Sequence, residues 1–297
     1  MPPDYARPDT LPEALALLAQ SRRQALAGGT DVYPAVTGKH ICRPVLDLSA
    51  IPDLRGIRRH AAGMRLGAMV TWAEVAGAGS PGAGVEGAEA EAAALPPACD
   101  ALRQAAVQVG GRQIQNAGTI GGNLCNASPA ADGVPPLLVL GAEVELASLR
   151  GTRRLPLAAF LTGPRRTALA PDELLVAVHL PDAGLAGASR FLKLGARAYL
   201  VISIAMVAVR LVVVRGMVTE AALAVGACSA VAVRLPLVEA ALPGAPLAQA
   251  AARIGDAAVA AALTPLDDLR ATAAYRAGAA AELLRRAVDD LAKEAAA

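Results

Sequence analysis

The sequence predicts an α+β protein, and two observations support this class. Residues 191–225 contain three apolar, strand-like segments that are followed by helical ones, so strands and helices are segregated along this part of the chain. Residues 1–181 instead mix short apolar segments with helical ones and with glycine-rich turns. We therefore expect a two-part N-terminal region, residues 1–55 and 56–181, followed by a C-terminal domain of a sheet with helices on one face, residues 182–297.

The first part has the pattern of a small βαβ unit. Thr10 is well placed to cap an amphipathic helix over residues 11–20. Residues 25–26 predict a short buried strand that ends in a tight turn at the glycines of residues 28–29. Residues 45–48 predict another short strand, which would complete the unit.

The second part is expected to combine helices with further strands. Strands or apolar core segments are expected at residues 63–71, 137–140, 143–146, 155–160 and 174–180, and helices at 71–75 and within 89–109. The prolines at 135–136 are expected to break the chain. Residues 76–87 contain two overlapping G-x-G-x-x-G matches, but they lack the preceding strand and the following acidic residue of a dinucleotide-binding fingerprint. They predict a surface loop.

The C-terminal part predicts a sheet and then helices. Strands are expected at residues 191–194, 201–214 and 218–225, with a turn at 215–216 between the last two. Helices are expected in two pieces over residues 236–263 and then from residue 266 to the end.

Composition excludes several classes of protein. Apolar residues make up 55% of the chain, yet no uncharged apolar run reaches the roughly 18 residues of a membrane-spanning helix, so we expect no membrane insertion. Lys and Arg (28) nearly balance Asp and Glu (26), and aromatic residues are only 2%, which argues against a nucleic-acid partner. Residues 1–7 lack the features of a secretory signal, so the expected location is the cytoplasm.

Scattered polar residues give no catalytic or metal motif. The four cysteines, Cys42, Cys99, Cys125 and Cys228, are far apart in sequence, so we expect free thiols and no zinc or iron–sulfur centre held by this chain alone. Cys125 is expected to be a small buried thiol. The three histidines have no catalytic context, and arginine pairs such as Arg22-Arg23 and Arg165-Arg166 are expected on the surface.

Two glycine-rich stretches are the candidate binding site. Residues 109–132 contain five glycines among small and hydrogen-bonding side chains, and residues 25–32 contain a second Gly-Gly turn. Glycines let a backbone approach a ligand closely and offer its N–H groups, which is how loops bind phosphate. Either stretch alone is more typical of a polar surface loop, whereas two of them could meet around one ligand.

Together these motifs resemble a known family. AGGTD at residues 27–31, TIGGN at 119–123 and SPAAD at 128–132 resemble the FAD-binding medium subunit of the molybdenum hydroxylases, the group of xanthine dehydrogenase, carbon monoxide dehydrogenase and 4-hydroxybenzoyl-CoA reductase. The resemblance implies a two-part FAD-binding domain (PCMH-type) and a C-terminal domain as in carbon monoxide dehydrogenase flavoprotein. It implies pyrophosphate contacts from Ala27, Gly28, Gly29, Thr30, Asp31, Thr119, Ile120, Gly121, Gly122 and Asn123, sugar contacts from Asn126 and Asp132, and flavin-ring contacts from Lys193, Leu175 and Tyr199.

A further segment, F-x-K-x-x-x-R, follows the predicted FAD domain. Lys193 and Arg197 occupy its charged positions. Without the resemblance, this pattern is equally typical of an ordinary charged strand end. The resemblance implies that Lys193 approaches the flavin, where a cation would raise its potential. Where many members of the family have an acidic residue, this chain has Leu-Val-Ile-Ser at residues 200–203, which puts the use of NAD in doubt.

The resemblance also implies partners. A large subunit would hold the molybdenum cofactor and a small one two [2Fe-2S] clusters, in a dimer of heterotrimers, while this chain would pass electrons from FAD to NAD, oxygen or another acceptor. One alternative is a self-sufficient FAD-dependent oxidoreductase, which needs its own substrate pocket with an acid or base. Another is a scaffold that has lost its flavin, against which the intact glycines argue.

Overall fold

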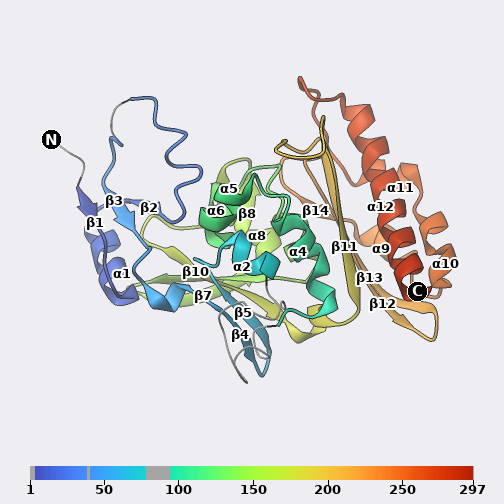
Figure 1. Cartoon of the computed structure of the whole chain (residues 1–297), viewed down its shortest axis with the longest axis horizontal. Coiled ribbons are helices and arrows are strands. Elements are labelled where there is room, and N and C mark those ends of the chain that lie inside the picture. The colour runs from blue at the N-terminus through green and yellow to red at the C-terminus, as the bar shows by residue number, and fades with distance from the viewer. Residues whose placement is uncertain (1–3, 39–40, 78–93, 297) are drawn as a thin grey trace.

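The computed structural model describes residues 4–38, 41–77 and 94–296. The chain is elongated, with the N-terminal strands at one end, a second sheet in the middle and the C-terminal sheet and helices at the other end (Figure 1). The expected surface loop at 76–87 and the start of the helix expected within 89–109 fall largely on residues 78–93, outside the described residues.

The first part forms the expected βαβ unit. A parallel sheet has the order β1-β3-β2, with β1 at Tyr5–Ala6, β3 at Val45–Asp47 and β2 at Gln24–Leu26. Helix α1 spans Leu11–Gln20, and the Thr10 side chain accepts a hydrogen bond from the Glu13 N–H, as predicted. A 3-10 turn, η1 (Pro52–Leu54), follows β3 and leads to the second part.

The second part is built on a five-stranded antiparallel sheet of order β4-β5-β10-β6-β7. Its strands are β4 (Ile57–His60), β5 (Gly63–Gly67), β10 (Leu174–Pro181), β6 (Glu143–Ser148) and β7 (Gly151–Pro156). Strand β4 was not predicted from the sequence, because an edge strand of largely exposed residues has no apolar alternation. A two-stranded sheet of β8 (Leu161–Gly163) and β9 (Arg166–Thr167) lies beside it.

Short helices complete the second part. They are α2 (Trp72–Gly77), α4 (Asp100–Ala106), α5 (Arg112–Ala117), α6 (Ile120–Asn126), α7 (Val134–Val139) and α8 (Leu157–Phe160), with 3-10 turns η2 (Pro97–Cys99) and η3 (Asp182–Leu185). The expectation that Pro135 and Pro136 break the chain was wrong. They lie in the first turn of α7, where a residue without an N–H loses no intrahelical bond.

The C-terminal sheet is antiparallel, with the order β11-β12-β13-β14. Its strands are β11 (Ala188–Leu194), β12 (Ala205–Val214), β13 (Met217–Gly226) and β14 (Val233–Arg234). Arg215 and Gly216 form the predicted turn with φ of 51° and 75°, as a type I′ hairpin requires. Residues 201–204, which were expected to begin β12, precede the strand.

Two expectations about the C-terminal helices were wrong. Residues 236–263 form four short helical pieces rather than two, and the last helix begins at Ala273 rather than residue 266. The pieces are α9 (Pro236–Glu239), α10 (Leu247–Ala250), η4 (Ala251–Arg253) and α11 (Asp256–Ala261), before α12 (Ala273–Ala296). Gly244 at φ of 77° and the nearby prolines interrupt the helical pattern. No helix in the described ranges is both long and apolar enough for a membrane span.

Both faces of the C-terminal sheet are buried. Its own helices, chiefly α12, cover one face as expected, whereas α4 and α7 of the second part cover the other (Figure 1). Burial on two faces explains the nearly continuous apolar sequence of β12. Arg210 interrupts this sequence and lies buried, with Nε donating to the Val139 carbonyl at 3.0 Å. This bond satisfies a carbonyl at the C-terminus of α7 and ties the two parts together.

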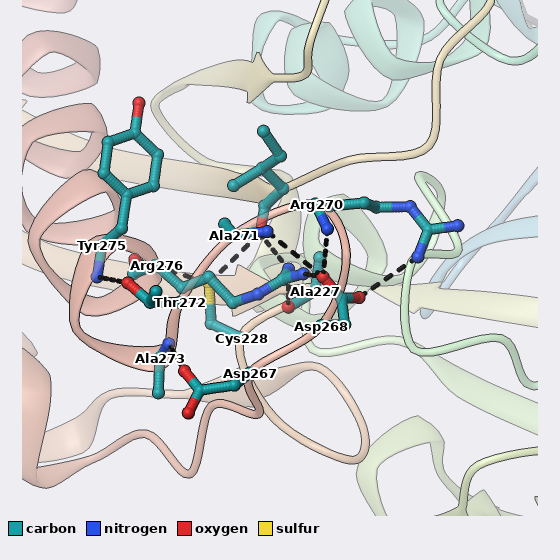
Figure 2. A network of polar contacts seen from close by, with 11 residues as sticks. Ala227, Cys228, Asp267, Asp268, Arg270, Ala271, Thr272, Ala273, Tyr275 and Arg276 are labelled. Carbon is teal, nitrogen blue, oxygen red and sulfur yellow. Dashed lines mark hydrogen bonds and ion pairs between the residues drawn. The ribbon is translucent and has the colours of Figure 1, made fainter.

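The buried side chain of Arg276 forms a hydrogen-bond network at the start of α12 (Figure 2). Arg276 is 4% exposed, and its Nη1 donates to the carbonyls of Ile204 (2.6 Å) and Ala227 (3.0 Å). Its Nη2 lies 2.6 Å from Oδ1 of Asp268, in the turn before the helix. The Thr272 hydroxyl accepts from the backbone N–H three residues on and caps the helix.

Asp268→Asn is expected to make the unfolding free energy less dependent on pH between about 4 and 2. The backbone N–H of Arg270, with help from the Arg276 guanidinium, lowers the pKa of the Asp268 carboxyl to about 2. A carboxyl with a lowered pKa in the folded state stabilises above its unfolded pKa of about 3.9, and this contribution is lost as the pH falls through the folded value. Urea unfolding midpoints from pH 5 to 2 measure the difference. Asp289→Asn, at an exposed carboxylate on α12, is the control; equal slopes for both variants would contradict the assignment.

Candidate functional site

A cavity of about 610 Å³ lies between the first and second parts of the chain. The turn after β2, the start of α6 and the segment before β10 form its walls. Its predicted lining residues are Ala27, Gly28, Gly29, Thr30, Asp31, Thr119, Gly121, Gly122, Asn123, Asn126 and Leu175. The two glycine-rich stretches, about 90 residues apart in sequence, therefore meet around one space, as the sequence analysis expected.

The turn after β2 presents unused backbone donors. Among the described residues, nothing accepts a hydrogen bond from the N–H groups of Gly28, Gly29, Thr30 and Asp31. Gly29 has φ of 70°, in the left-handed region of backbone conformation that favours glycine. Successive free N–H groups in such a turn form a concave site that favours anions.

The start of α6 shapes the wall of the cavity but offers few free backbone N–H donors. The N–H groups of residues 120–123 are already bonded: those of Ile120 and Gly121 to the carbonyls of Val70 and Ala68 at 2.9 Å, that of Gly122 to Thr119 Oγ1 at 3.0 Å. The expectation of an open loop offering its N–H groups was therefore wrong for this stretch, which folds as a capped helix. A Cβ on Gly121 would lie 2.7 Å from the Ala68 carbonyl oxygen, so this glycine is required by packing.

Two side chains of α6 have polar groups at the cavity. Asn123 Oδ1 is buried and has no hydrogen-bond partner among the described residues. Asn126 donates from Nδ2 to Asp31 Oδ1 at 2.8 Å and accepts from Arg165, so it joins the two glycine-rich walls. Of these two side chains, Asn123 is therefore the one with a polar atom left without a partner.

Four predicted residues do not line the cavity. Ile120 is fully buried in the core, and Tyr199 is 76% exposed. Asp132 and Lys193 pair with each other instead, with Lys193 Nζ 2.7 Å from Asp132 Oδ2 and both side chains less than 10% exposed. Ser203 donates to the other carboxylate oxygen at 3.1 Å. Burial raises the pKa of the Asp132 carboxyl, and the Lys193 ammonium opposes that shift.

The sequence analysis also missed residues of this site. Arg23, expected on the surface, lines the cavity with its side chain only 8% exposed. Cys125, expected to be buried, is exposed and lines the same space. Residues 167–174 form one wall. A pattern in sequence cannot find such residues, because their position depends on how the first part packs against the second.

The site fits a flavin nucleotide. The free N–H groups at Gly28 to Asp31 suit a pyrophosphate, the orphaned Asn123 oxygen suits a hydroxyl donor, and the cavity is within the size range of cofactor pockets. Among the described residues, no three potential metal-ligating side chains cluster. The fold and the cavity fit the class of proteins that bind an organic nucleotide cofactor.

Comparison with known proteins places the chain in a family. A model described as the FAD binding domain in molybdopterin dehydrogenase matches residues 2–183, and one of the CO dehydrogenase flavoprotein C-terminal domain matches residues 190–291. The chain belongs to the family of FAD-binding flavoproteins of the molybdopterin dehydrogenases, a class of oxidoreductase components. The predicted family, fold class and FAD cofactor are confirmed.

Individual relatives agree with this placement. The chain is 35% identical over 180 residues to the xanthine dehydrogenase FAD-binding subunit of Escherichia coli O157:H7, a match over 60% of this chain and 57% of that subunit. It is 31% identical over 288 residues to the nicotine 6-hydroxylase medium subunit of Paenarthrobacter nicotinovorans, over 96% and 95% of the two chains. A structure of reconstituted CO dehydrogenase from Oligotropha carboxidovorans superposes with a TM-score of 0.82 and 28% identity, over 97% and 98% of the chains.

Proposed function

We propose that this chain is the FAD-binding electron-transfer subunit of a cytoplasmic molybdenum hydroxylase. Its partners would be a large subunit with the molybdenum cofactor and a small subunit with [2Fe-2S] clusters, assembled as a dimer of heterotrimers. The observation that carries the proposal is the cavity with free backbone donors inside a chain whose whole length matches this family. The relatives that bear the names of xanthine dehydrogenase and nicotine 6-hydroxylase subunits support it.

The residues of the cavity have distinct roles in this proposal. The turn at Gly28 to Asp31 would hold the pyrophosphate, and Asn123 and Asn126 would face the sugar hydroxyls. Leu175, at the start of β10, would pack against the ring. Bound FAD can accept electrons singly and deliver them as a pair, which suits a relay between iron–sulfur clusters and an acceptor.

Asp132, Lys193 and Ser203 would act at the flavin end of the site. Their buried cluster joins the loop after α6 to the C-terminal domain. In this proposal Lys193 would bring a positive charge toward the flavin end of the site, partly offset by its Asp132 partner, and a cation there favours the anionic reduced form of the cofactor. Tyr199, which is exposed in the isolated chain, would cover the ring. With the proposed domain boundaries at residues 55 and 181, the ring would lie between domains.

The final acceptor is proposed only as a class. NAD, oxygen or another carrier would take the electrons at the open edge of the ring. Residues 200–202 of this chain are apolar, and the resemblance to the family implies an acidic residue there in NAD-dependent members, so we propose an acceptor other than NAD.

The chain alone is expected to bind FAD but not to oxidise purines, aldehydes or other hydroxylase substrates. Adding the two partner subunits should restore bleaching of the flavin absorbance by substrate, because the electrons reach FAD through the partners' metal centres. Absorbance at flavin wavelengths, with molybdenum and iron analysis, measures both expectations. Turnover by the metal-free chain alone would overturn the proposal and favour a self-sufficient FAD-dependent oxidoreductase.

A further inference from the structure

We propose that Arg23 recognises the adenine end of bound FAD and so makes this site select FAD over FMN. The inference rests on the FAD site proposed above and adds to it a residue that none of the sequence motifs contains. It starts from a buried guanidinium that the protein leaves incompletely bonded.

Arg23 lies immediately before β2 and lines the cavity together with Leu18 and Leu48. Its side chain is 8% exposed, and Nη2 is 2.5 Å from Oδ2 of the exposed Asp4. Its Nε and Nη1 are buried without any hydrogen-bond partner among the described residues. Buried polar groups are nearly always hydrogen-bonded in folded proteins, and Arg23 combines two unpartnered donors with a place in the cavity lining, so these donors are available to a ligand.

Arg23 and the pyrophosphate turn lie at opposite ends of β2. Four residues separate Arg23 from Gly28, so their Cα atoms are up to roughly 16 Å apart at about 3.3 Å per residue. Anions would be held by the free N–H groups at the turn itself. Arg23 therefore faces one of the two arms that extend from the pyrophosphate of FAD.

The position of the flavin identifies that arm. Lys193, the residue assigned to the ring, belongs to β11, whereas Arg23 precedes β2 at the opposite end of the molecule (Figure 1). With the ring directed toward β11, the adenosine arm extends toward Arg23. Adenine presents ring nitrogens as acceptors for guanidinium donors, and its flat faces suit the side chains of Leu18 and Leu48.

The test compares FAD, FMN and ADP as ligands of the apoprotein. FMN lacks adenosine, and ADP carries adenosine without the flavin. We expect Arg23→Ala to raise the Kd of FAD and of ADP at least tenfold and to change the Kd of FMN less than twofold. Arg23→Lys, which keeps the charge with a different donor geometry, should fall between wild type and Arg23→Ala.

Arg190→Ala is the matched control. Arg190 is also a partly buried arginine with an unpartnered Nε and an ion pair to an exposed carboxylate, Glu294, but it does not line the cavity. The Arg190→Ala substitution should leave the Kd values of FAD, FMN and ADP unchanged. Thermal unfolding of each apoprotein checks that the variants fold.

Each outcome decides the inference. Equal weakening of FAD and FMN by Arg23→Ala, or no change in the Kd of ADP, would overturn the role of Arg23 while leaving the FAD site intact. Failure of the wild-type apoprotein to bind FAD would overturn both the site and the inference. Selective loss of FAD and ADP binding, absent in the Arg190 control, would support it.

Discussion

Gly28→Ala is expected to weaken FAD binding strongly. A Cβ at Gly28 would lie 1.7 Å from the carbonyl oxygen of Ala117 and 2.4 Å from its carbonyl carbon. These are backbone atoms at the end of α5, so no side-chain rotation can relieve the overlap. The turn after β2 and the wall formed by α6 must move apart, which displaces the free N–H groups at residues 28–31 from the opposite side of the cavity.

The size of the effect follows from the cost of overpacking. Forcing an extra carbon into a filled site typically costs about 1–3 kcal/mol, which corresponds to a rise in Kd of about five- to 150-fold if it falls on the bound state. The ratio of flavin to protein absorbance after gel filtration measures the loss. Gly38→Ala is the control, because no atom of the described residues, apart from its chain neighbours, lies within 4 Å of the position that a Cβ would take there. A Gly28→Ala protein with a full complement of FAD would show that the turn does not hold the cofactor.

Asp132→Ala is expected to destabilise the apoprotein by about 3–5 kcal/mol. The substitution leaves the Lys193 ammonium, 7% exposed, without its carboxylate, and it removes the acceptor of the Ser203 hydroxyl. Breaking a buried pair from one side is costly because an uncompensated charge remains. Measuring urea unfolding without FAD separates this effect from any loss of cofactor contacts.

The double variant Asp132→Ala/Lys193→Met separates the charge from the packing. Removing both partners leaves no buried charge, so most of the lost unfolding free energy should return. A double variant that is less stable than Asp132→Ala alone would show that the cluster stabilises by packing or by its contact with the C-terminal domain. Arg59→Ala, which removes an exposed ion pair with Asp182, should change stability by less than about 1 kcal/mol.

Local sequence was sufficient for the elements whose signals lie within a few residues. Helix α1 begins at its Thr10 cap, and the hairpin between β12 and β13 turns at Arg215-Gly216, because caps and tight turns depend on neighbouring residues alone. The alternation of β6 likewise predicted a strand with one buried face. The two glycine-rich stretches predicted the position of the cavity. Their backbone freedom and their resemblance to a family are both properties of short segments, so local sequence was sufficient.

Tertiary structure decided the features that depend on distant parts of the chain. The stretch at residues 119–126 folds as a helix because Val70 and Ala68 accept its first N–H groups, and Gly121 is required there by its packing against Ala68. Asp132 and Lys193 are 61 residues apart, and only the packing of the C-terminal sheet on α4 and α7 makes them a buried pair. Arg23 is charged like its exposed neighbour Arg22, but its side chain is 8% exposed, lines the cavity and pairs with Asp4, 19 residues earlier in the chain. Burial of a charge is a property of the surrounding surfaces, which the residue's own segment does not encode.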